Sequence, residues 1–226
     1  FLYLNKKILV EKPLLMNTRE IKEIELLQKK NNNLIVSYPY LFSKTLKYAK
    51  KIINSNLLGK IKYVEINMKQ CGRFMKYGVN HLLGPHAISI LSLFYNLKGL
   101  KYQNNKIIQK GSRIETSLIS FYNKKRNVSN INLSLNYARD ESVKEINIYC
   151  EKGTIHCDLN NKNYTLKAYS YESKKVRNYN VATIKLRIKK KYDEKNNMKY
   201  SIENFLKNNL DKNNFFLTKL INKVIS

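Results

Sequence analysis

The sequence predicts an α/β fold over residues 1–58 and an α+β fold over residues 59–226. The first observation is a strand–helix–strand–helix order in the first part, with the short apolar strands that are typical of parallel sheets. The second is a change near residue 59 to strands in which apolar and polar residues alternate, as in antiparallel sheets with one solvated face. The third is size, because 226 residues of which 43% are hydrophobic can bury a sizeable core.

The first part contains two strand–helix pairs. A nearly continuous apolar run at 7–11 predicts a buried parallel strand, and Pro13 ends it. Asn17 or Thr18 can cap the following helix. The apolar stripe of that helix consists of Ile21, Ile24 and Leu27. Asparagines at 31–33 interrupt the helix before a second apolar strand at 34–38, so the order predicts a βαβ unit.

A second helix follows, with Ser43 as its N-cap and Gly59 as its stop. Its apolar stripe consists of Leu46, Ala49, Ile53 and Leu57. We place the boundary between the two domains directly after this helix, at residues 58 and 59. The boundary is a change of pattern, since the sequence has no Pro-rich or Ser-rich linker there.

The second part predicts an open, mostly antiparallel sheet with helices on one face. An alternating run at 61–66 opens it, and a helix is expected from about Leu82 to Tyr95. Further strands are expected at 114–122, 128–138, 143–150, 154–159, 164–170 and 184–189. Two amphipathic helices close the chain. The first carries Ile202, Phe205, Leu206 and Leu210, and the second carries Leu217, Leu220, Ile221, Val224 and Ile225. The last helix is a candidate to pack back on the first domain.

The charge of the chain leaves one alternative function open. Lys and Arg total 43 against 16 Asp and Glu, which gives a formal net charge of +27. Such a charge is compatible with a basic nucleic-acid-binding protein. The excess is nearly all Lys, whereas specific readers of bases favour Arg. A codon bias toward A and T, which enriches lysine throughout an ordinary protein, therefore explains the charge better. We expect no specific nucleic-acid partner.

Cysteine spacing and hydropathy argue against other classes. Cys71, Cys150 and Cys157 lack CxxC spacing, so we expect no metal site and no disulfide scaffold. Cys150 and Cys157 are expected to be buried free thiols, which agrees with a cytoplasmic location. No apolar run approaches the ~20 residues that a membrane span needs, so no membrane partner is expected.

The motif that carries chemistry in the first domain is Glu11-Lys12-Pro13. It lies at the carboxyl end of the first predicted strand, and open α/β sheets bind ligands at that edge. A lysine there can donate a hydrogen bond to a substrate oxygen or relay a proton. By itself the tripeptide is a weak signal, because a strand-end lysine is common in so lysine-rich a chain.

Several motifs in the same order resemble the Gfo/Idh/MocA family of nicotinamide-dependent sugar oxidoreductases. They are Glu11-Lys12-Pro13, the segment from Tyr38 to Phe42, Leu58-Gly59-Lys60-Ile61, Leu83-Gly84-Pro85-His86 and Glu151-Lys152-Gly153-Thr154. The resemblance implies the C-terminal remainder of a dinucleotide-binding Rossmann domain at 1–58, followed by a substrate-binding and oligomerisation domain at 59–226. It also implies NAD or NADP as the cofactor and a homo-oligomer. The implied substrate is a sugar or nucleotide-sugar, including a nucleotide-linked sugar for surface polysaccharide.

The resemblance also assigns roles to individual residues. Lys12 and His86 would be the catalytic pair, exchanging the proton of the reacting hydroxyl while hydride moves between substrate and cofactor. The cofactor-binding residues would be Glu11, Lys12, Pro13 and Tyr38. The substrate-binding residues would be Lys12 and His86, with Asn80 and His81 as nearby polar candidates.

Four departures from the family pattern bear on activity. Leu82 stands where the family pattern has an acidic residue, and Ser89 stands where it often has an aspartate. Leu41 replaces the arginine of the family's Arg-Phe pair, whereas Phe42 matches that pair. No G-x-G-x-x-G turn follows a strand, and the chain opens with Phe1. We therefore expect an N-terminally incomplete sequence whose present part is inactive alone. The alternative is a catalytically inactive remnant or non-enzymatic relative of the family.

Overall fold

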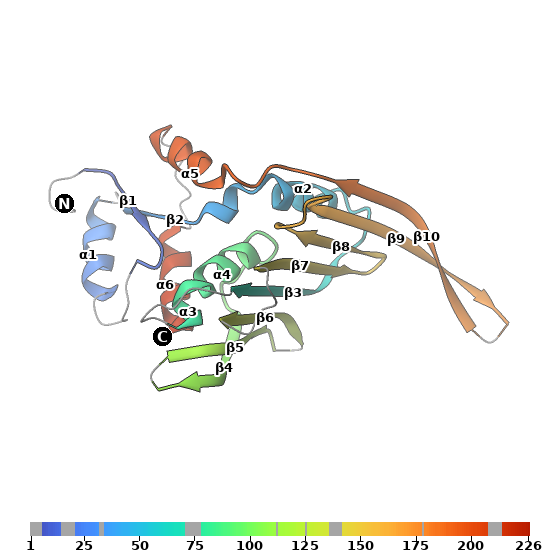
Figure 1. The fold of residues 1–226 in the computed structure, drawn as a ribbon, viewed down its shortest axis with the longest axis horizontal. Coiled ribbons are helices and arrows are strands. Elements are labelled where there is room, and N and C mark those ends of the chain that lie inside the picture. Colours follow the sequence, from blue (N-terminus) through green and yellow to red (C-terminus); the bar gives the residue numbers. More distant parts are fainter. Residues whose placement is uncertain are drawn as a thin grey trace.

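The computed structural model describes residues 6–14, 21–31, 34–70, 78–111, 113–124, 126–135, 142–177, 179–207 and 214–226. Its strands are β1 (Ile8–Glu11), β2 (Leu34–Ser37), β3 (Ile61–Gln70), β4 (Lys101–Lys110), β5 (Arg113–Tyr122), β6 (Asn127–Leu135), β7 (Val143–Cys150), β8 (Gly153–Asp158), β9 (Leu166–Val176) and β10 (Tyr179–Lys190). Its helices are α1 (Ile21–Asn31), α2 (Lys44–Asn54), α3 (Val79–Leu82), α4 (Gly84–Ser92), α5 (Asn197–Leu206) and α6 (Asn214–Ile225), with a 3-10 helix η2 at Pro39–Phe42. Figure 1 shows their arrangement.

The first part forms the predicted βαβ unit. Strands β1 and β2 are parallel, with Ile8 opposite Leu34 and Glu11 opposite Ser37, and α1 connects them. The two cap candidates of α1, at 17 and 18, lie outside the described residues. The predicted cap of α2 is confirmed, because the Ser43 side chain accepts a hydrogen bond from the Leu46 N–H at 3.1 Å.

The second part is an eight-stranded sheet in the order β10-β9-β8-β7-β3-β6-β5-β4. Only the β3–β6 pair is parallel among these described strands, so the expected mostly antiparallel sheet is confirmed. Alternation along the strands separates the two faces: Ile146 and Ile148 of β7 are fully buried, whereas Tyr149 is 40% exposed. Helices α2 and α4 cover the apolar face.

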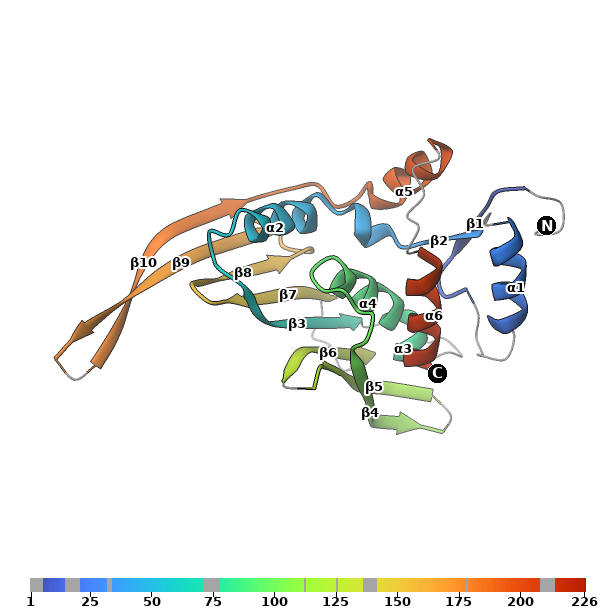
Figure 2. The same cartoon turned by 180° about the vertical axis from the view of Figure 1, so that it is seen from behind.

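One hydrophobic core joins both parts of the chain. It includes Tyr38, just after β2, together with Ile66 of β3 and Ile221 of α6. Helix α6 is tied directly to β2, because the Asn214 side chain accepts from the Val36 N–H at 2.9 Å and donates to the Val36 carbonyl at 2.8 Å. In Figure 2 α6 stands between the βαβ unit and the large sheet. The last helix therefore packs against residues of the first part.

Strand β4 and helices α2 and α5 differ from the expectations. Strand β4 was not predicted, because its residues are nearly all exposed and its sequence lacks apolar alternation. Helix α2 ends at Asn54, so Gly59, with a φ of +71°, turns the chain toward β3 instead of capping the helix. In α5 the expected apolar stripe faces solvent at Ile202 and Leu206, which are 43% and 71% exposed. Leu210 lies outside the described residues.

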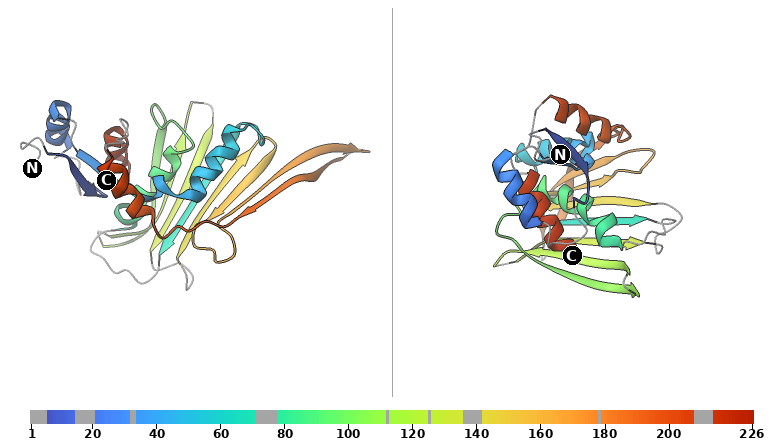
Figure 3. Two further views of the ribbon diagram at one scale, coloured as in Figure 1. Left: turned by 90° about the horizontal axis from the view of Figure 1, so that it is seen from above. Right: turned by 90° about the vertical axis from the view of Figure 1, so that its left-hand side faces the viewer.

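Strands β9 and β10 extend further than the expected strands at 164–170 and 184–189. Their outer ends project well beyond the other strands, as Figures 1 and 3 show. An ion pair of 2.9 Å between Lys185 and Glu172 bridges the two strands in this projecting part. The extension was missed because its residues are exposed and mostly polar, which removes the periodic signal.

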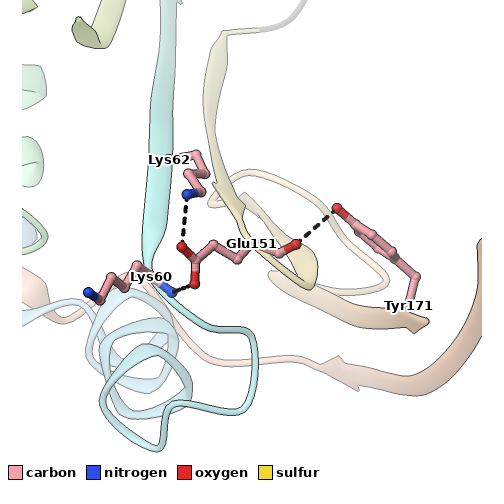
Figure 4. Close-up of polar contacts among 4 residues, drawn as sticks. All are labelled: Lys60, Lys62, Glu151 and Tyr171. Atoms are coloured by element: carbon pink, nitrogen blue, oxygen red, sulfur yellow. Dashed lines mark hydrogen bonds and ion pairs between the residues drawn. The ribbon is translucent and has the colours of Figure 1, made fainter. Parts of the chain in front are cut away.

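Glu151 ties the β7–β8 turn to the start of β3. Its carboxylate accepts from the Lys60 N–H at 3.1 Å and pairs with the Lys62 ammonium at 2.8 Å (Figure 4). The Glu151 N–H donates to the Lys60 carbonyl at 3.1 Å, and the Tyr171 hydroxyl donates to the Glu151 carbonyl at 3.4 Å. The hydrogen bond from Lys62 is the main reason why the pKa of Glu151 lies below its usual value of 4.5.

We expect Glu151→Gln to lower Tm at pH 7 and to have a shrinking effect in acid. A carboxyl whose pKa is lower in the folded state stabilises that state above its unfolded value, 4.5, and the contribution is lost as the pH falls through the lower folded value. Thermal unfolding of both proteins from pH 7 to pH 3 measures this. A Tm difference that stays constant over this range would contradict the assignment.

Candidate active site

Lys12 lies directly after β1, at the carboxyl end of the parallel pair. Its ammonium donates to the carbonyl oxygen of Leu82 at 2.8 Å, across 70 residues of sequence. That carbonyl is at the end of α3, where the last carbonyl groups of a helix lack intrahelical donors. The hydrogen bond brings the strand-end lysine to the junction of α3 and α4.

His86 lies in the first turn of α4, two residues after Gly84. Its imidazole meets the ring of Tyr40 edge-on, with centroids 5.0 Å apart and an interplanar angle of 85°. Tyr40 belongs to η2, which follows β2. The start of α4 is therefore held beside the same edge of the βαβ unit that carries Lys12.

Lys12 and His86 line one cavity of about 180 Å³. Its described lining residues are Lys12, Tyr40, Met68, Lys69, Gln70, Leu82, Leu83, His86, Ser142, Val143 and Lys144. Three of them are lysines and none is an aspartate or glutamate. Such a site favours a group on which negative charge develops, such as the oxygen of a hydroxyl that loses its proton.

The other predicted cofactor-binding residues, Glu11, Pro13 and Tyr38, are not among the described residues that line this cavity. Glu11 is exposed at the end of β1, and Pro13 is half-buried beside Lys12. Tyr38 is only 1% exposed, and its hydroxyl donates to the Thr218 hydroxyl of α6 at 3.0 Å. Burial raises the pKa of Tyr38 above its usual value, against the lowering effect of that hydrogen bond. Tyr38 thus joins β2 to α6 from inside the core.

We expect Tyr38→Phe to lower the stability of the protein by about 1 kcal/mol, which is the usual value of one hydrogen bond. The corresponding fall in Tm is about 2–4 °C for a chain of this size. Tyr169→Phe is the matched control, because Tyr169 is 39% exposed and its substitution should change Tm little. An unchanged Tm together with weaker cofactor binding would assign Tyr38 to the cofactor site instead.

The two candidate substrate residues before the α4 start do not line this cavity. Asn80 is fully buried in α3, and its side-chain oxygen accepts from the Ser117 hydroxyl of β5. His81 is half-buried in the last turn of α3. Neither is among the described lining residues. Both remain predictions as substrate-binding residues.

Two of the residues that differ from the family pattern, Ser89 and Leu82, make backbone contacts at the candidate site. Ser89 is fully buried and donates to the His86 carbonyl at 2.8 Å, so its hydroxyl bonds the helix backbone. At position 82, the backbone carbonyl serves as the acceptor for Lys12, while the leucine side chain offers no charge. The lysine is therefore positioned by a neutral oxygen at the point where the family pattern has an acid.

Tyr40 and Lys144 are among the lining residues that the sequence analysis did not single out. Tyr40 was quoted only as part of the segment from Tyr38 to Phe42, yet it touches both His86 and Lys144, whose ammonium lies 5.7 Å from the ring centroid. Lys144 occupies a position of β7 with the same parity as the buried Ile146 and Ile148. A lysine on the apolar parity of a strand was the available signal.

The expectation for Cys150 and Cys157 is confirmed. Cys150 and Cys157 are buried free thiols, as expected, and burial raises the pKa of Cys150 to about 11. Among the described residues, no helix is long and apolar enough to cross a membrane.

Comparison with known proteins places the fold. No family model and no curated protein matches the sequence. Solved structures do match. KijD10, a 3-ketoreductase from Actinomadura kijaniata in complex with TDP-benzene and NADP, has 9% identity and a TM-score of 0.71 over 97% of this chain and 68% of its own. UDP-N-acetylglucosamine 3-dehydrogenase GnnA from Acidithiobacillus ferrooxidans has 14% identity and a TM-score of 0.72 over 99% and 70%.

An inositol dehydrogenase homolog from Azotobacter vinelandii, complexed with NADH and myo-inositol, has 10% identity and a TM-score of 0.74 over 99% of this chain and 69% of its own. This chain therefore shares the fold of these neighbours over nearly its whole length. The neighbours are of the Gfo/Idh/MocA type, so the resemblance read from the sequence motifs is confirmed at the level of the fold.

Proposed function

We propose that this chain is part of an NAD(P)-dependent oxidoreductase that acts on a hydroxyl of a sugar or nucleotide-sugar. The single observation that carries the proposal is the cavity that Lys12 and His86 both line. The two residues come from separate parts of the chain, and both were assigned to the chemistry by the sequence resemblance. Neighbours that bind NADP with TDP-benzene, or NADH with myo-inositol, support the same reaction class.

The residues present fit the nicotinamide end of such a cofactor. Lys12 and Pro13 follow β1 at the edge where parallel sheets bind ligands, beside a cavity of about 180 Å³. The seven glycines of the chain form no G-x-G-x-x-G turn after a strand, so the proposal assigns no residue of this sequence to the pyrophosphate. When bound, the nicotinamide supplies the hydride acceptor or donor.

The residues of this chain would position the substrate and move its proton. Lys12, held by the Leu82 carbonyl, donates to the oxygen of the reacting hydroxyl and stabilises the charge that develops there. His86 takes the proton in the oxidising direction and returns it in the reducing direction. The ring of Tyr40 fixes the edge-on orientation of the imidazole. The lysine-rich lining holds the oxygen without a competing carboxylate.

The direct test is turnover by the complete reading frame. Binding is measured by titrating the purified protein with NADH and NADPH. Turnover is then assayed with NAD+ or NADP+ as the hydride acceptor, through the absorbance of the reduced nicotinamide that forms, with myo-inositol, free hexoses and UDP-N-acetylglucosamine as substrates. We expect one reduced cofactor to bind and at least one of these compounds to react. Cofactor binding without turnover on any sugar would favour the inactive relative, and the absence of both would overturn the proposal.

The proposal includes a homo-oligomer formed through the sheet face opposite α2 and α4. Tyr149 of β7 and Tyr169 of β9, 40% and 39% exposed, lie on either side of Thr154 of β8 in one cross-strand row of that face, and the ring of Tyr63 is 6.0 Å from that of Tyr149. Exposed aromatic rings of this kind are enriched at protein interfaces. Light scattering after gel filtration measures the mass, and a single-chain mass would contradict this part of the proposal.

A further inference from the structure

A second, larger cavity adjoins the candidate active site. It has a volume of about 820 Å³, within the range of small-molecule sites, and it shares Tyr40 and Lys144 with the smaller cavity. Its other walls are the loop after β8, at 159–162, and the segment after β10, at 191–195. The smaller cavity, about 180 Å³, cannot hold more than a small part of a drug-sized ligand.

The lining of the larger cavity has more lysines than carboxylates, so its net charge is positive. Its lysines are Lys144, Lys162, Lys191 and Lys195. Lys191 donates to the Asn161 carbonyl, whereas neither Lys162 nor Lys195 has an ion-pair partner among the described residues. Two ammonium groups are thus available to an anionic ligand.

The two carboxylates of the lining are engaged within the chain. Asp193 accepts from the Lys195 N–H at 2.9 Å and from the Asn196 side chain at 3.1 Å. Glu194 accepts from the Thr45 N–H at 3.1 Å and from the Asn197 side chain at 2.9 Å. These hydrogen bonds hold the carboxylates to the backbone and to neighbouring amides. They do not neutralise the lysines by direct ion pairs.

The cavity also offers aromatic surface. Tyr192 lines it and packs against Tyr48, with ring centroids 5.7 Å apart at an interplanar angle of 49°. The ring of Tyr40 stands at the junction of the two cavities. Aromatic rings bind nucleobases by stacking, and lysines bind phosphate oxygens, so the combination is suited to a nucleotide.

We infer that the larger cavity binds the nucleoside diphosphate end of the substrate and directs the attached sugar past Tyr40 and Lys144 to Lys12 and His86. This rests on the proposed function and narrows its substrate class to nucleotide-sugars. Phosphate oxygens would meet Lys162 and Lys195, and the base would meet Tyr192. A neutral sugar or polyol would leave the larger cavity unused.

The test is the binding of UDP to this chain, measured by calorimetry at about physiological salt, where exposed charges are screened. Wild type is compared with the double variant Lys162→Gln/Lys195→Gln. The matched control is Lys174→Gln/Lys175→Gln on β9, which removes the same charge from exposed positions outside the cavity. We expect about a tenfold rise in the Kd for UDP in the cavity variant, the effect of losing charge-assisted hydrogen bonds, and an unchanged Kd in the control.

Three results would overturn the inference: equal weakening in both variants, no UDP binding, or inorganic pyrophosphate binding as tightly as UDP. Because UDP binding needs neither cofactor nor turnover, its outcome is separate from that of the proposed function. Turnover of myo-inositol by a protein that does not bind UDP would uphold the reaction and overturn the nucleotide site. UDP binding without turnover on any sugar would uphold the nucleotide site and count against the proposed reaction.

Discussion

Replacing Lys12 by methionine should lower kcat/KM of the complete protein by roughly 10²–10⁴-fold, the range of a positioned proton-transfer group. The substitution keeps the apolar stem but removes the ammonium that faces the cavity and donates to the Leu82 carbonyl. The lost hydrogen bond should cost about 1 kcal/mol of stability, too little to unfold the chain. Steady-state kinetics and a thermal melt of the same preparation separate the two effects.

Lys50→Met is the control for Lys12→Met. It removes the same charge from an exposed position of α2, outside the cavity that Lys12 and His86 line, so its turnover should match that of wild type. Should Lys12→Met keep a kcat/KM within twofold of the control, Lys12 has no part in the chemistry. A large loss of both Tm and turnover would instead assign Lys12 a structural role through Leu82.

Gly153→Ala should destabilise the fold by about 3 kcal/mol or more, at the upper end of the effect of overpacking. A Cβ at this position would lie 2.2 Å from the Tyr169 carbonyl oxygen, 2.8 Å from Leu58 Cδ2 and 3.0 Å from Ser170 Cα. Two of these atoms belong to the backbone of β9, which pairs with β8 at Gly153, so they cannot move without disturbing the ladder. The expected fall in Tm is about 6–12 °C.

Gly99→Ala is the control that separates steric overlap from backbone conformation. Gly99 has a φ of +82°, and nothing lies within 4 Å of a Cβ built on it. Its substitution should cost only the left-handed backbone conformation, about 1–2 kcal/mol. Thermal melts of both variants give the comparison, and a Gly153→Ala protein as stable as Gly99→Ala would refute the close approach of β8 and β9.

Local patterns in the sequence were sufficient for the order of the elements. Apolar continuity predicted β1 and β2, and the change to meander-like strands predicted a strand at 143–150, which is β7. Patterns failed where exposure removes the apolar signal, as in β4 and the outer ends of β9 and β10. The periodicity of a segment reports burial of one face, so a strand that is exposed on both faces has no signature to read.

For the candidate site, the resemblance read from the sequence proposed Lys12, after a parallel strand, and His86, at a helix start, as the residues that carry chemistry. Only the tertiary structure decided which groups meet. The contact of Lys12 with the Leu82 carbonyl spans 70 residues, and the contacts of Tyr40 with His86 and Lys144 join three separate elements. Packing also turned Tyr38 and Asn80 into the core, away from the cavity. The physical reason is that a local pattern specifies the face on which a side chain lies, whereas its partner is set by how distant elements pack over the shared core.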